Sequence, residues 1–212
     1  MSDFFHAVDP RQIRQAVDWI TDATSEASLL GGDPSDEIRS VRTALASSSA
    51  LDSDTPWRLG WRQAQVARRA LGLGDDSRLD IEQYVPTRLR VGVDPRLQAV
   101  GVAPDDFVRP TIVLGRAAGP SSTRFIQGRA LWHRLANDES TFLITKSYTD
   151  LQKIGRAFAA ELLAPAEGIR IKLPLPPSEA VEEDLGPVAD HFGVSPILIE
   201  HQIENQILSG RH

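Results

Sequence analysis

The feature that most constrains this chain is a change of hydrophobic period near residue 120. Before it lie three short apolar runs, TRLRVGV (87–93), LQAVGVA (97–103) and RPTIVLG (109–115), separated by Asp-Pro, Pro-Asp-Asp and Gly signals typical of turns between strands. After it, apolar residues recur at three- and four-residue steps, as they do in amphipathic helices. The order of helices, small sheet and helices predicts an α+β fold with a small mixed β-sheet.

An acidic segment precedes the sheet and is predicted to hold two helices. The first runs from Asp9 to Leu30 and ends at Gly31-Gly32, and the second begins at Asp33 or Ser35. The polar stretch 47–56 is typical of a linker, so we predict a boundary near residue 54 between an N-terminal helical segment, 1–54, and a second domain, 55–212. We expect the apolar stripe of the first helix to be buried against the helix 57–73, a second copy or a partner protein; the stripe comprises Ile13, Val17 and Ile20, with Trp19 at its edge.

Composition excludes several classes of protein. The chain has no cysteine, which excludes disulfides and thiolate metal sites, and no run approaches the roughly 18 apolar residues that a membrane span requires. We therefore expect a soluble cytoplasmic protein. The net charge of −6 disfavours general binding to nucleic acid. Only the helix 57–73 is basic, and a nucleic-acid contact there would use Arg58, Arg62, Arg68 and Arg69; the simpler interpretation is a solvated face.

Further helices are predicted at 79–86, 124–136, 149–163, 179–192 and 195–207. Ser121-Ser122 is interpreted as a helix cap, and NDES (137–140) as a solvated turn. The offsets of Ala189, Gly193 and Ile199 are those of a helix-turn-helix. The second helix of that pair has no lysine or arginine, so a structural role is favoured over DNA recognition.

Three phrases in residues 56–208 resemble those of the ImmA/IrrE-like zinc metallopeptidases, which are gluzincin-type proteins of bacterial and phage regulatory systems. These phrases are Arg124-Phe125, the run Phe158 to Pro165 (FAAELLAP), and Phe192 to Ser195 (FGVS). The resemblance implies a zincin-like helix packed against the sheet. It also implies where the active-site residues of such an enzyme would fall.

The active-site positions are degenerate. Aligned on Arg124-Phe125, the first metal-binding histidine becomes Arg129, the catalytic glutamate becomes Ala130, and only the second histidine is kept, as His133. The third ligand falls on Gln152 or Ile154. Catalytic zinc needs about three protein ligands, and a guanidinium cannot be one of them. We therefore expect no bound metal, no cofactor and no catalytic residue; residual metal-dependent peptidase activity is the alternative.

Two hypotheses describe what fills the former metal cavity. In the first, Trp132 and Arg129 plug the cavity together, with a cation–π contact between them. In the second, Trp132 is ordinary core and Arg129 points to water. The five histidines of the chain, at 6, 133, 191, 201 and 212, show no motif of a different hydrolytic centre.

The sequence thus predicts a pseudopeptidase that binds another protein as a regulatory or structural subunit in a bacterial or phage system, or that forms a homodimer. Zincins pair an extended substrate with an edge strand above the active helix. The strand nearest in sequence to that helix is Thr111, Ile112, Val113 and Leu114, and strand pairing does not require a metal. The alternative function is a DNA-binding regulator that uses the helix 57–73 with the C-terminal helix pair.

Overall fold

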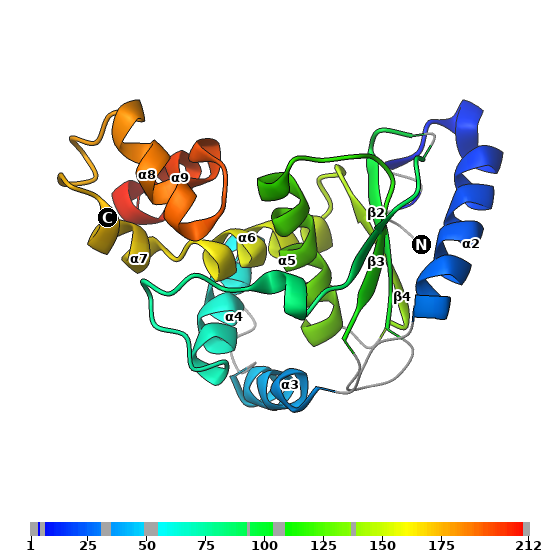
Figure 1. Ribbon diagram of the computed structural model, residues 1–212, viewed down its shortest axis with the longest axis horizontal. Helices are drawn as coiled ribbons and strands as arrows, with labels where there is room; N and C mark the ends of the chain where they lie inside the picture. Colours follow the sequence, from blue (N-terminus) through cyan, green and yellow to red (C-terminus); the bar gives the residue numbers. More distant parts are fainter. Residues whose placement is uncertain are drawn as a thin grey trace.

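The computed structural model describes residues 4, 7–30, 35–48, 55–92, 94–103, 109–136 and 139–209. A mixed sheet lies between helix α2 (Ile13–Leu30) on one face and helix α5 (Pro120–Ala136) on the other (Figure 1). The C-terminal helices stand on the far side of α5, away from the sheet. The predicted α+β class with a small mixed sheet is confirmed.

The sheet has four strands in the order β1-β3-β2-β4. They are β1 (Thr87–Leu89), β2 (Leu97–Val102), β3 (Thr111–Leu114) and β4 (Thr141–Thr145). Strand β1 runs parallel to β3, and β2 runs antiparallel to both β3 and β4. The first three strands lie inside the predicted apolar runs. Strand β4 was not predicted, although its TFLIT sequence is rich in the β-branched and aromatic residues that favour strands.

The prediction that Thr111 to Leu114 form an edge strand is wrong. Strand β3 is hydrogen-bonded on both sides, to β1 through Ile112 to Leu114 and to β2 through all four residues. Every residue of the strand is buried. A strand with both ladders occupied has no free backbone groups for an added peptide. Proximity in sequence to α5 failed as a guide because the chain enters that helix from the middle of the sheet.

Helix α2 covers one face of the sheet, and its buried side differs from the predicted stripe. Ile13 and Val17 are 37% and 45% exposed, whereas Trp19 is 6% exposed. The small residues Ala16, Ala23 and Ala27 share the buried side and let the helix lie close to the strands. The indole of Trp19 also donates a hydrogen bond to the carbonyl of Arg90, at 3.1 Å. The short helix η1 (Pro10–Gln12) precedes α2.

The second helix of the N-terminal segment joins the main core. Helix α3 (Asp36–Ser48) packs against α4 (Pro56–Ala70), the basic helix predicted at 57–73, and buries Ile38, Val41 and Leu45. The hydroxyl of Ser35 accepts a hydrogen bond from the backbone N–H of Ile38, as the predicted start requires. Most of the predicted linker, and the boundary at residue 54, lie outside the described residues. Helix α3 therefore buries its apolar side within this chain, and α2 is buried against the sheet while Ile13 and Val17 of the predicted stripe stay exposed.

Three helices form the layer behind the sheet. Helix α5 packs on α6 (Asp150–Leu163), and α6 packs along α4. A methyl group on Gly60 would lie 2.5 Å from the carbonyl oxygen of Ile154, so glycine allows the close approach of α4 and α6. Helix α5 begins at Pro120, so Ser121 and Ser122 lie in its first turn and are not its cap. The helix predicted at 79–86 is the short turn η2 (Ile81–Gln83).

The C-terminal helices are α7 (Ala166–Lys172), which was not predicted, α8 (Glu182–Phe192), α9 (Pro196–Gln202) and η3 (Ile203–Leu208). The turn between α8 and α9 contains Gly193 in a left-handed conformation, with φ of 68°. Ala189 and Ile199 are buried on either side of it. This pair has the spacing of a helix-turn-helix. Within the described part of the chain, no helix combines the length and the apolar character needed to cross a membrane.

Candidate functional site

Arg129, which the resemblance aligns with a metal-binding histidine, is buried, with 2% of its surface exposed. Its guanidinium donates to the side-chain oxygen of Gln98 on β2 at 2.5 Å and to the carbonyl of Thr145 on β4 at 2.7 Å. It also donates to the side-chain oxygen of Gln152 on α6. The hypothesis that Arg129 points to water is therefore wrong. The guanidinium links the helix to two strands and to α6 through neutral acceptors.

Gln152 closes the free edge of β4. Its side-chain oxygen accepts from the backbone N–H of Thr145 at 3.2 Å, and its nitrogen donates to the carbonyl of Leu143 at 3.0 Å. The amide thus makes the pair of hydrogen bonds that a neighbouring strand would make. Because Arg129 also bonds the carbonyl of Thr145, the C-terminal half of this edge is occupied by side chains. An unpaired sheet edge invites other strands, and this one is covered.

The aromatic neighbours of Arg129 along α5 are Trp132 and His133. The indole of Trp132 donates to the side-chain oxygen of Gln63 on α4 at 2.8 Å, and it lies against Gly155 of α6. The imidazole of His133 is buried and stacks on Phe142 of β4, with ring centroids 4.8 Å apart and planes 6° apart. Trp132 therefore packs between α4 and α6 while Arg129 extends toward the sheet.

These residues do not fit a zinc ion. Ala130 is buried and has no group that could accept a proton. Gln152 uses both ends of its amide on β4, and Arg129 holds a positive charge beside it. Among the described residues, no cluster of three or more His, Cys, Asp or Glu side chains could hold a metal ion. The arrangement can position side chains and close a sheet edge, and it supplies no ligand set for a metal.

Arg124, which opens the first phrase of the resemblance, has a structural role. Its guanidinium contacts both carboxylate oxygens of Glu82 at 2.8 and 2.7 Å and donates to the carbonyl of Leu79 at 2.6 Å. Burial would raise the pKa of the Glu82 carboxyl, but backbone hydrogen bonding and Arg124 outweigh it and hold this pKa below its ordinary value. Arg124 thereby anchors the segment that leads into β1.

The four arginines predicted as a nucleic-acid contact do not share one face. Arg68 is buried and donates to the carbonyls of Leu162 at 2.7 Å and Ser77 at 2.9 Å, so its assignment to a contact is wrong. Arg58 and Arg69 are exposed, and Arg62 is half-buried. Burial lowers the pKa of Arg68, and nearby carboxylates act in the opposite direction. Arg68 belongs to the packing of α4 on α6.

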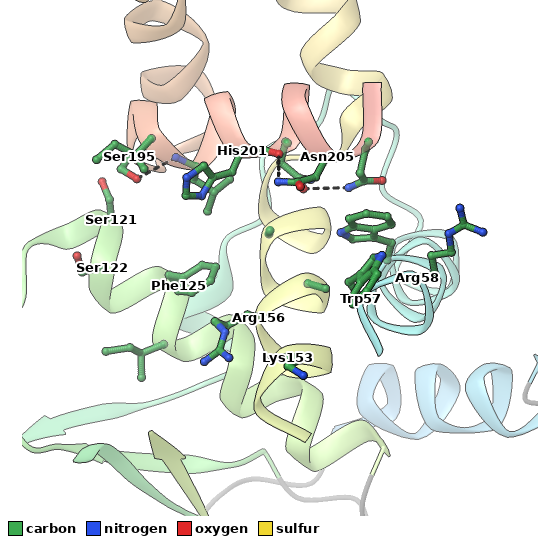
Figure 2. A pocket seen from close by; sticks show the side chains of 18 of the residues that line it. Trp57, Arg58, Ser121, Ser122, Phe125, Lys153, Arg156, Ser195, His201 and Asn205 are labelled. Carbon is green, nitrogen blue, oxygen red and sulfur yellow. Dashed lines mark hydrogen bonds between the residues drawn. The ribbon is translucent and has the colours of Figure 1, made fainter. Parts of the chain in front are cut away.

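A pocket of about 970 Å³ lies beside the residues around Arg129. It is bounded by the N-terminal turns of α4 and α5, by α6, and by α9 with η3 (Figure 2). Gln98, which accepts a hydrogen bond from Arg129, also lines the pocket and connects the two regions. The volume lies at the upper end of the roughly 300–1,000 Å³ range of ligand pockets. Sequence reasoning missed this pocket because segments far apart in the chain form it.

Comparison with known proteins adds no assignment. No protein-family model matches this chain, and no curated protein sequence matches it significantly. The fold, the contacts of Arg129 and the pocket are therefore described from their own geometry.

Proposed function

We propose that this chain is a catalytically inactive, metallopeptidase-like protein that acts by binding another protein. The observation that carries the proposal is the buried guanidinium of Arg129 and its hydrogen bond to Gln152. The resemblance aligns Arg129 with a metal-binding histidine and aligns the third ligand with Gln152 or Ile154. A cation held there repels a divalent metal, and an amide that already pairs with β4 is not available for coordination. By the resemblance, such a protein would serve as a regulatory subunit in a bacterial or phage system.

The pocket is the surface that supports binding. Pairing of a partner strand with β3 is excluded by its two neighbours, and the C-terminal half of the β4 edge is closed by Gln152 and Arg129. The pocket, in contrast, is open to solvent and lined by large exposed side chains, including Trp57 and Tyr148, which are 45% and 82% exposed. Exposed aromatic residues are frequent anchors of protein interfaces.

Two measurements on the full chain test the proposal. First, zinc content and cleavage of a fluorogenic peptide library are measured after purification with added zinc. Stoichiometric zinc together with cleavage would overturn the proposal. Second, a photo-crosslinking amino acid is placed at Tyr148 in the pocket and, as the control, at Val91, which is 77% exposed and does not line the pocket. We expect one defined crosslinked product with another protein when the crosslinking amino acid replaces Tyr148, and none when it replaces Val91. Equal adducts from both positions would contradict specific binding.

A further inference from the structure

The pocket combines aromatic walls with a basic floor. Its aromatic side chains come from three places: Trp57 and Trp61 on α4, Phe125 on α5, and Tyr148 just before α6. Two charged side chains from α6, Lys153 and Arg156, lie below the space between these walls (Figure 2). Aromatic faces accept apolar and planar groups, and cations close to them select for negative charge.

The charges that line the pocket have one sign. Its cationic side chains are Arg58, Lys153 and Arg156, and none of the described lining residues is aspartate or glutamate. Lys153 is partly compensated by the exposed carboxylate of Asp150, 2.9 Å away. Arg58 has no ion pair among the described residues, and the imidazole of His201 also lines the pocket. A ligand bound here meets positive charge without a competing carboxylate from the walls.

Contacts with the protein hold the Arg156 guanidinium in a defined position. One guanidinium nitrogen donates to the carbonyl of Ser147 at 3.0 Å, and the guanidinium carbon lies 5.2 Å from the ring centroid of Tyr148. The other terminal nitrogen, Nη2, is buried and has no hydrogen-bond partner among the described residues. The positive charge of Arg156 is therefore met, among the described residues, by one carbonyl and one aromatic ring and by no carboxylate, so it attracts an anion in the pocket. Figure 2 shows Arg156 extending from α6 to a position below Phe125.

The N-terminal ends of two helices add to the positive potential of the pocket. The first turn of α5 brings Ser121 and Ser122 to the pocket wall, and the first turn of α4 brings Trp57 and Arg58. The N-terminal end of a helix carries a partial positive charge that stabilises a nearby anion. Two such ends therefore reinforce the cations of α6.

We propose that this pocket binds an acidic peptide segment of a partner protein, with carboxylates near Arg156 and Arg58 and an aromatic side chain between the tryptophans and Phe125. The proposal rests on the proposed function in that it names the chemistry of the partner. A peptide suits the pocket better than a nucleic acid because the chain carries a net charge of −6, which disfavours a phosphate backbone that continues beyond the pocket.

Fluorescence anisotropy with three labelled peptides tests the proposal on the full chain. The first peptide alternates glutamate and phenylalanine, the second has lysine in place of glutamate, and the third has serine in place of phenylalanine. A short single-stranded DNA is the fourth probe. We expect the first peptide to bind at least about tenfold more tightly than the others, since both charge complementarity and aromatic contact are required. Binding should weaken as the NaCl concentration rises.

Three variants locate the binding. We expect Arg156→Gln to weaken binding of the first peptide by about tenfold or more, because the positive charge at the floor of the pocket is lost. Arg58 lies at the exposed rim of the pocket, so Arg58→Glu reverses a charge without disturbing the core. This substitution should also weaken binding of the first peptide. The matched control is Arg69→Glu on the same helix, which is exposed and does not line the pocket. Its effect should stay below about twofold.

Each outcome decides the question. Equal binding of the glutamate and lysine peptides, no binding of any probe, preferential binding of the DNA, or wild-type affinity in both Arg156→Gln and Arg58→Glu overturns the inference. Mass spectrometry of the recovered peptide separates this inference from the proposed function. A peptide that is bound with the expected selectivity but cleaved refutes the inactive assignment alone, whereas an intact and unbound peptide refutes only the pocket's preference.

Discussion

Replacement of Arg129 by alanine tests the role of the buried guanidinium most directly. The side chain donates to Gln98, Thr145 and Gln152, and all three acceptors are neutral. A hydrogen bond to a charged group contributes about 1.5–3 kcal/mol, and an acceptor left buried without a partner costs about 1–3 kcal/mol. Removal of the charge also recovers its desolvation penalty, which offsets part of the loss. We expect Arg129→Ala to lower the free energy of unfolding by about 3–5 kcal/mol.

Urea denaturation followed by circular dichroism measures this change, with an unchanged m-value as the sign that both variants unfold in the same way. Arg69→Ala is the control and should change stability by less than about 0.5 kcal/mol, because Arg69 is exposed. Arg129→Lys keeps the positive charge but loses the planar guanidinium, so its loss of stability should lie between those of Arg69→Ala and Arg129→Ala. A loss below about 0.5 kcal/mol for Arg129→Ala would refute the reasoning that the guanidinium holds helix and sheet together.

Two further predictions concern helix packing and acid stability. Gly60→Ala places a methyl group 2.8 Å from the Cβ of Ala157, so it should lower the free energy of unfolding, measured by thermal unfolding, by about 1–3 kcal/mol. Gly186→Ala is the control: Gly186 has open space around it, so this change should be neutral or stabilising. Equal effects of the two substitutions would contradict the close approach of α4 and α6. Burial opposes ionisation of Asp94, but hydrogen bonds from Arg96 and two backbone N–H groups outweigh it and hold its pKa below the ordinary 3.8. A lowered pKa in the folded state stabilises the protein at higher pH, so the stability difference between wild type and Asp94→Asn should shrink as the pH falls below about 4; a difference that is constant with pH would contradict this.

Local features of the sequence determined the class of the fold and most helices. Helix α6 follows from its apolar period and from the Thr149 hydroxyl, which accepts a hydrogen bond from the backbone N–H of Gln152 as a cap. Helix α3 follows in the same way from Ser35. These signals act within a few residues of the chain, so they can be recognised without knowing the neighbours. The degenerate positions Arg129 and Gln152 were also assigned from sequence, but only through the resemblance.

Tertiary structure decided the strand order, the buried charges and the pocket. The interior place of β3 depends on pairing with β1, more than twenty residues earlier, and no local pattern encodes that choice. Arg68 and Arg129 are buried because carbonyls and amides from distant segments accept their hydrogen bonds. The sequence placed Arg68 on a solvated face and left the burial of Arg129 open. On α2, alanines face the sheet because a close helix approach favours small side chains, which leaves Ile13 and Val17 exposed. Hydrophobic period identifies a helix, but the shape of the partner surface selects which of its faces is buried.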